Sequence, residues 1–295
     1  STMKANLIIF LNVLCVVVFL SNTSMAGDVK ENEYVYVLAV NGGNVFRITN
    51  QASGNKEKIR IKECIYPGTV IKIGKDATIT LACSDSGRIL VKTHKDSPYT
   101  VNMKEFEWDR SVVKTLIESV IRAIGEAISP DETGQPKILV TRMPGLCNRL
   151  WPPDEAKILT TKEPIAFKWI LDGGNFSLEI KDDKESTIYS KETSANKIDV
   201  PIKTFKPGGK YTWSLKKEGK DIGCEINFTL FSEDESSSIM KTLDDISSLL
   251  PKEVDRETRC RLQAGYLRSE DLVYDAWQLL ERNGITQEQT KKNDK

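Results

Sequence analysis

Histidine is nearly absent from this chain of 295 residues, which contains a single one, His94. Hydrolytic triads normally need histidine as a base, and zinc sites normally use histidine or paired cysteines as ligands, so both kinds of site lack their usual residues. No CxxC pair is present, and Gly42-Gly43 and Gly173-Gly174 suit hairpin turns better than phosphate-binding loops. We therefore predict no catalytic residue, metal or cofactor, and we interpret His94 as a surface-loop residue.

An excess of charge of either sign is also missing, since 42 basic residues balance 42 acidic ones. Nucleic-acid binding relies on a concentrated basic surface, so the overall composition does not favour a nucleic-acid partner, although a local patch stays compatible with it. The carboxylate pairs Asp182-Asp183 and Asp244-Asp245 have the chemistry for acid–base catalysis or calcium binding. Lysines flank the first pair and the second lies on a predicted helix surface, so we interpret both as solvated charges.

The N-terminus has the pattern of an export signal. Lys4 precedes an apolar run, Leu7–Leu20, and the small residues Ser24 and Ala26 stand where a signal peptidase requires them. We predict a signal peptide over 1–26, cleaved before Gly27, and a mature protein in the periplasm or outside the cell with no membrane span. An uncleaved anchor is the alternative, but a membrane-spanning helix needs about 20 apolar residues.

Five cysteines follow the predicted cleavage site, and an oxidising compartment allows them two disulfides at most. Cys64 with Cys83, both in the first β region, is the first candidate pair. Cys147 with Cys224, near the two ends of the second β region, is the other candidate. Buried free thiols are the alternative interpretation for all of them.

Short strands separated by turns fill the first part of the mature chain. Alternating apolar residues at 34–40 and 77–83 are typical of strands with one buried face, and the turn residues between them favour a small barrel or sandwich. Apolar residues at 112–128 then recur with helical spacing, so a helix should pack on this β region. We predict a domain over 27–128 and a linker at 129–136, where Pro130, Gly134 and Pro136 interrupt regular structure.

A second β region is predicted over 137–231. Alternation at 165–169, 176–180, 211–215 and 224–230, with Gly-rich turns between, indicates about seven antiparallel strands and an immunoglobulin-like or fibronectin-III-like sandwich. A helical segment follows over 232–285, with an acidic, serine-rich joint at 232–238 and helices near 239–250, 253–268 and 270–282. The polar tail 286–295 is predicted to be disordered. The fold class is mainly β with a helical C-terminal segment: a small β-barrel-like domain, an Ig-like β-sandwich and a helical hairpin.

The first β region resembles the FecR-like domain. The resemblance rests on Gly43-Asn44-Val45, on Pro67-Gly68-Thr69-Val70 with Ile73-Gly74, and on the segment 86–91. The second β region, with its Pro207-Gly208-Xaa-Xaa-Tyr211-Xaa-Trp213 pattern, is similar to the Ig-like segments that follow such domains. The helical end resembles a single tetratricopeptide-like hairpin, where an array needs about three repeats. These resemblances imply a role in sensing, scaffolding or polymer binding at the cell envelope and no catalytic residue.

Three aromatic residues are the candidates for ligand or partner contacts: Trp151, beside two prolines, and Tyr274 and Trp277 in the last helix. Exposed aromatic rings stack on sugars, whereas buried ones form a core, and core packing is the favoured interpretation for Trp169 and Trp213. The leading hypothesis is an exported, non-enzymatic binding or scaffold protein of the bacterial envelope whose partner is another envelope protein. The alternative is a polysaccharide-binding module.

Overall fold

The structure is a computed structural model that describes residues 33–50, 54–108, 112, 114–128 and 147–285. The chain divides into two compact units, Ser1–Glu33 and Tyr34–Lys295, and the description below concerns the second. The predicted signal peptide, the linker at 129–136 and the polar tail lie outside the described residues.

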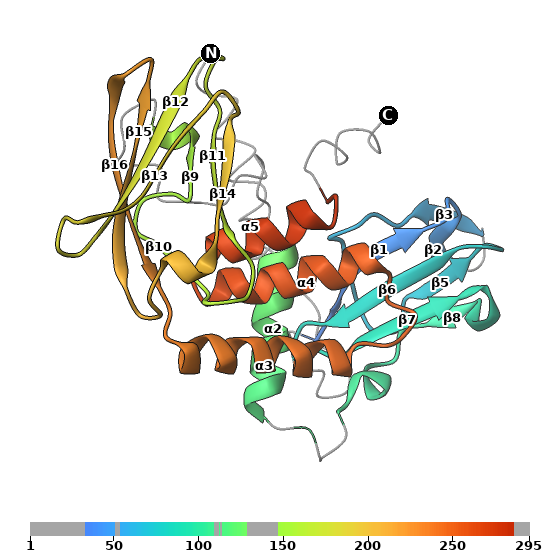
Figure 1. Cartoon of the computed structure of the whole chain (residues 1–295). Helices are drawn as coiled ribbons and strands as arrows, with labels where there is room; N and C mark the ends of the chain where they lie inside the picture. Colours follow the sequence, from blue (N-terminus) through green and yellow to red (C-terminus); the bar gives the residue numbers. More distant parts are fainter. Residues whose placement is uncertain (1–32, 51–53, 109–111, 113, 129–146, 286–295) are drawn as a thin grey trace, which may run out of the picture. The chain divides into compact units, whose positions relative to one another are not determined.

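Two four-stranded antiparallel sheets form the first β region (Figure 1). In spatial order, one contains β4 (Cys64–Ile65), β1 (Val35–Asn41), β6 (Thr78–Cys83) and β7 (Ile89–Thr93). The other contains β3 (Asn55–Lys58), β2 (Val45–Asn50), β5 (Val70–Ile73) and β8 (Tyr99–Thr100), with short 3₁₀ turns at His94–Asp96 and Met103–Phe106. Neither sheet closes on itself among the described strands.

The alternation in the sequence sets the core between these sheets. Val35 and Val37 of β1 and Ile71 and Ile73 of β5 are at most 1% exposed, and the residues between them on each strand are more accessible. Since successive side chains of a strand point to opposite faces, each strand offers one apolar side to the shared core. Phe106 closes this core from the second 3₁₀ turn.

The second β region is a sandwich of a five-stranded and a three-stranded sheet (Figure 1). In spatial order, the larger contains β10 (Ala156–Ile158), β16 (Lys220–Leu230), β15 (Lys210–Lys217), β12 (Phe176–Asp182) and β13 (Thr187–Thr193). The smaller contains β14 (Lys197–Val200), β11 (Ile165–Trp169) and β9 (Leu150–Trp151). Strand β10 pairs with β16 in parallel, and the other pairs are antiparallel.

Aromatic rings from both sheets fill the sandwich. Trp169 and Trp213 are 2% and 0% exposed, which confirms the core interpretation for these two tryptophans. Phe167 from the smaller sheet meets Trp213 from the larger one edge to face, with ring centroids 5.2 Å apart. Edge-to-face aromatic pairs are stabilising beyond the area they bury, so these rings join the two sheets.

Four helices complete the described chain: α2 (Lys114–Ile128), α3 (Glu233–Leu249), α4 (Arg256–Ser269) and α5 (Val273–Arg282). Helix α3 begins six residues earlier than the predicted start at Ile239, so the acidic segment expected to be a joint is its first turn and a half. Ser232 caps the helix by accepting a hydrogen bond from the Glu235 backbone N–H, and the Ser232 backbone N–H donates to the Glu235 carboxylate, which is a capping box. Acidic residues in the first turn also match the positive end of the helix dipole.

The helices share one hydrophobic core with the outer face of the sheet that contains β1. Ala82 and Ile89 of that sheet lie in the same core as Ala123 of α2 and Leu262 of α4. Helix α2 crosses α4 at Gly265, where an added Cβ would lie 2.3 Å from the Ala123 carbonyl oxygen. Glycine is therefore required for this close approach of two helix backbones.

The chain is thus mainly β with helices near its C-terminus, as the sequence predicted. Helices α4 and α5 pack on each other, as a hairpin does, and each also packs on another part of the chain: α4 on α2, and α5 on the sandwich, where Tyr274 joins the sandwich core. No helix in the described part of the chain is long and apolar enough to cross a membrane.

Candidate functional site

The three aromatic residues singled out in the sequence form one cluster in the structure. Trp151 at the end of β9 lies 4.7 Å from Trp277 between ring centroids, and 6.2 Å from Tyr274, both on α5. Trp151 and Trp277 are partly buried against the sandwich core, and Tyr274 is 3% exposed. Their faces are therefore largely used in attaching α5 to the smaller sheet of the sandwich.

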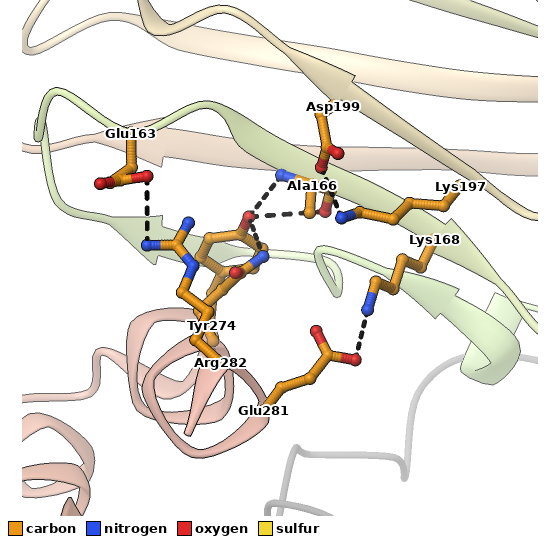
Figure 2. Close-up of polar contacts among 9 residues, drawn as sticks. Glu163, Ala166, Lys168, Lys197, Asp199, Tyr274, Glu281 and Arg282 are labelled. Atoms are coloured by element: carbon orange, nitrogen blue, oxygen red, sulfur yellow. Dashed lines mark hydrogen bonds and ion pairs between the residues drawn. The ribbon is translucent and has the colours of Figure 1, made fainter. Parts of the chain in front are cut away.

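A hydrogen-bonded tyrosine lies at the centre of this attachment (Figure 2). The Ala166 backbone N–H donates to the Tyr274 hydroxyl at 2.7 Å, and Gln278 donates to the same oxygen at 2.8 Å. The hydroxyl also lies 3.4 Å from the Ala166 carbonyl oxygen, to which it donates. Burial raises the pKa of Tyr274 well above its usual value, so the hydroxyl keeps its proton at neutral pH.

Two ion pairs join α5 to the sandwich near Tyr274 (Figure 2). Lys168 of β11 pairs with Glu281 of α5. The ammonium nitrogen of Lys168 also lies 4.6 Å from the centre of the Trp277 ring. Arg282, at the end of the same helix, lies 3.6 Å from a Glu163 oxygen. A cation over an indole ring is a favourable contact. Lys168 therefore holds α5 through two contacts, the ion pair with Glu281 and the cation–π contact with Trp277.

Asp275 joins α5 to the other sheet of the sandwich. Its carboxylate accepts a hydrogen bond from the Leu159 backbone N–H, directly after β10, at 3.1 Å. Burial raises the pKa of Asp275 to about 7, although the Leu159 bond and the charge of Arg282 oppose this change. No pattern in the sequence marks this buried carboxyl group.

The disulfide predictions had different outcomes. Cys147 and Cys224 form a disulfide, with an S–S distance of 1.97 Å and Cα atoms 5.7 Å apart. Cys64 and Cys83 are free thiols, so the prediction of a bridge between them is wrong. They lie on the strands either side of β1, where Cys64 is opposite Tyr36 and Cys83 is opposite Val35. Neighbouring residues of a strand point to opposite faces, so the two sulfur atoms lie on different sides of the sheet.

The remaining polar candidates have ordinary structural contacts. His94 is exposed, and its Nδ1 lies 3.0 Å from the Ile73 carbonyl oxygen. Asp182 accepts hydrogen bonds from the backbone of Lys184 and Ser186, which shapes the turn after β12. In the part of the chain that the structure describes, no group of three or more histidine, cysteine, aspartate or glutamate residues is placed to hold a metal ion.

A surface hollow that no sequence motif predicted lies beside Trp108. Its volume is about 680 Å³, and we call it the Trp108 hollow. The residues that line it are Arg88, Ile89, Leu90, Lys104, Glu107, Trp108, Val112, Leu249, Leu250 and Pro251. Arg88 lies over the Trp108 ring at 5.9 Å and donates to the Glu107 carbonyl oxygen. The hollow joins residues more than 140 positions apart in sequence, which is why no local motif marks it.

Taken with the fold, these features describe a protein of two β modules connected by helices, with a hollow of mixed apolar and charged lining beside Trp108. No protein-family model matches the chain, and no curated protein matches it. Solved structures do match, and one of them is the structure of a "Biofilm associated protein - BSP domain". That match has 10% sequence identity and a TM-score of 0.23, and it covers 68% of this chain and 45% of that chain. The chain therefore spans less than half the length of that structure, and a similarity of this size carries no functional argument.

Proposed function

We propose that this protein is an exported, non-catalytic binding or scaffold protein of the bacterial cell envelope, and that it acts through contacts with another envelope protein. The observation that carries the proposal is the Trp108 hollow. Tryptophan and arginine are, with tyrosine, the residues enriched among those that dominate binding energy at protein interfaces. Here they lie beside the apolar side chains of Leu249, Leu250 and Pro251, with Lys104 and Glu107 as a polar rim.

The disulfide supports the proposed location. Disulfides persist in the periplasm and outside the cell and are rare in the reducing cytoplasm, so the Cys147–Cys224 bridge favours an exported chain. The export pattern of residues 1–26 and the FecR-like pattern of the first β region support the same location. The periplasm or the cell surface is the location that we propose.

The packing of the helices on both β regions supports a scaffold role. Helices α2 and α4 pack on the first β region, and α5 packs on the sandwich. The alternative of a polysaccharide-binding module gains nothing from Trp151, because its ring packs on Trp277 and Tyr274.

Site-directed photo-crosslinking in the native host tests the proposal. A photoreactive residue at Lys104, on the rim of the hollow, should give one discrete adduct with an envelope protein, and Leu249→Ser should reduce that adduct. The same residue at Lys216, an exposed position on the outer face of the sandwich, is the matched control. Equal adducts at both positions would contradict the proposed site. Turnover of an envelope substrate that one point mutation abolishes would contradict the non-catalytic role.

A further inference from the structure

The outer face of the sheet β3-β2-β5-β8 carries apolar side chains among lysines. Val45 and Arg47 of β2 are opposite Ile73 and Ile71 of β5, and those two isoleucines are buried in the core. The residues between them must point to the opposite, outer face, because side chains alternate along a strand. We call this outer set the lysine face, and its members are Phe46, Ile48, Val70, Lys56, Lys58 and Lys72.

The apolar members of the lysine face have no place in the interior. Phe46, Ile48 and Val70 are half-buried, and none of them belongs to the three hydrophobic cores of the described residues. Phe46 and Ile48 are two residues apart on β2 and therefore share one face, and Ile48 is paired with Val70 of β5. A group of apolar side chains on a sheet face, outside any core and with a polar rim, is a feature of binding sites.

The lysines of this face are exposed and have no ion-pair partner among the described residues. Lys58 and Lys72 flank Phe46 on the two neighbouring strands, so their Cα atoms are about 10 Å apart, which is two strand spacings. Glu57, the acidic residue of β3, is opposite Arg47 and pairs with it at 2.8 Å on the other side of the sheet. The positive charge of the face is therefore not neutralised by its own strands.

We propose that the lysine face binds an acidic polysaccharide, a polymer of sugar rings that carry carboxylates. Amphipathic sugar rings have an apolar C–H face that packs on an aromatic ring, here Phe46, and on the aliphatic side chains beside it. Carboxylates on neighbouring rings reach the ammonium groups on either side, which form charge-assisted hydrogen bonds with them. Strands β3, β2 and β5 are neighbours in one sheet, so an extended polymer can lie across several strands.

The shape of the face favours a polymer that lies flat on it, in preference to a membrane surface. Membrane-bound surfaces insert apolar side chains about 5–10 Å into the headgroup region, which needs protruding residues. Phe46 lies between Lys58 and Lys72, Ile48 lies between Lys56 and Val70, and both apolar side chains are half-buried. A peptide strand would use the backbone of a sheet edge, whereas these six residues occupy the face of a sheet.

This inference goes beyond the proposed function, because the lysine face is formed by β2, β3 and β5 and the Trp108 hollow is lined by none of their residues. It rests on the proposed function in one respect: the proposed export is the reason for choosing a polysaccharide and not a nucleic acid as the ligand. The two proposals therefore have separate tests.

Binding of the purified mature protein to polygalacturonate, with neutral dextran as the uncharged reference, tests this proposal by titration calorimetry or affinity electrophoresis. The double variant Lys58→Gln/Lys72→Gln should lose about tenfold or more in affinity and should bind with a weaker salt dependence, since it removes charge-assisted contacts. Phe46→Thr should weaken binding at every salt concentration. The control Lys216→Gln/Lys220→Gln removes two exposed lysines from the sandwich, and it should bind as the unmodified protein does.

Each outcome decides the proposal. Saturable binding to polygalacturonate that both lysine-face variants weaken, with unchanged melting temperatures, supports it. Absence of binding, or binding that the variants leave unchanged, overturns it. Equal binding to poly-glutamate that does not depend on Phe46, or tighter binding to oligo(dT) or to phosphatidylglycerol vesicles, also overturns it, because the face would then recognise a different class of partner. The crosslinking experiment at Lys104 tests the Trp108 hollow, so its failure would not change the interpretation of binding to polygalacturonate.

Discussion

The Tyr274 hydroxyl of α5 accepts a hydrogen bond from the Ala166 backbone N–H of β11 at 2.7 Å, across 108 positions of sequence. The contact attaches the last helix to the smaller sheet of the sandwich. Ala166 is suited to it, because a side chain without atoms beyond Cβ lets the tyrosine approach the backbone of the strand.

Tyr274→Phe should lower the free energy of unfolding by about 1–3 kcal/mol, because it leaves the buried Ala166 N–H without a partner. Urea unfolding followed by tryptophan fluorescence measures the change. Tyr189→Phe is the control, since the Tyr189 side chain is partly exposed on edge strand β13, and it should change the stability by less than about 0.5 kcal/mol. Equal effects of the two variants would contradict the role of the Tyr274 hydroxyl.

Gly265→Ala should destabilise the protein by at least about 1–3 kcal/mol, since the new methyl group would lie 2.3 Å from the Ala123 carbonyl oxygen and push α4 away from α2. Gly125→Ala on α2 is the matched control. No atom lies within 4 Å of its added Cβ, so the better helix former should stabilise the protein by about 0.5–1 kcal/mol. Thermal unfolding of both variants checks that their changes in stability have opposite signs. An unchanged stability of Gly265→Ala would show that the two helices do not cross so closely.

Removal of the disulfide by Cys147→Ser/Cys224→Ser should cost about 4 kcal/mol in the chain-entropy description, since the bridge closes a loop with a sequence separation of 77. Reducing agent should destabilise the unmodified protein to a similar extent and should leave the double variant unchanged. Cys64→Ser, at a half-buried free thiol, is the control with a small effect. Mass mapping of the unreduced mature protein should find this single bridge; a Cys64–Cys83 bridge would contradict the structure.

Asp275 should make stability depend on pH. Its pKa is raised by burial from 3.8 to about 7, so between these values the folded protein holds a proton that the unfolded chain has lost. Stability from this group is therefore present at low pH and is lost as the pH rises from about 4 to about 7. Asp275→Asn keeps an oxygen acceptor for Leu159 and does not ionise, so it should remove this loss. Urea unfolding at pH 5 and pH 8 compares the two proteins, and parallel pH profiles would contradict the prediction.

Trp277→Leu should reduce stability by about 1–2 kcal/mol, because it removes the edge contact with Trp151 and the cation–π contact with Lys168. Lys168→Met tests the second contact in the same background. A double-mutant cycle by urea unfolding should give a coupling energy of about 0.5–2 kcal/mol between the two positions. Additive effects would show that the ammonium group and the ring act independently.

Local pattern predicted much of the fold. The two-residue alternation at 34–40, 77–83, 165–169 and 176–180 corresponds to strands β1, β6, β11 and β12, because burial on one face of a strand requires that period. The helical period gave α2, α4 and α5 within a few residues. The start of α3 was missed although its signal was present, since Ser232 and Glu235 have the spacing of a capping box.

The sequence predicted which aromatic residues belong to the candidate site but not that they lie together. Trp151, Tyr274 and Trp277 were chosen one by one as aromatic residues without an assigned partner, and the structure shows that they contact one another. The separation of β9 and α5 along the sequence does not predict that the two elements contact each other. The Trp108 hollow was not predicted at all, because its lining comes from β7, the residues after it and the end of α3.

The sequence by itself determined the fold class of this protein, through strands with one apolar face and helices with an apolar stripe. The tertiary structure decided which cysteines pair, which helix packs on which sheet, and which polar atoms become buried. The physical reason is that periodicity is set by neighbours along the chain, whereas a disulfide, a glycine crossing such as Gly265 on Ala123, and the raised pKa of Asp275 depend on atoms that only the folded chain brings together.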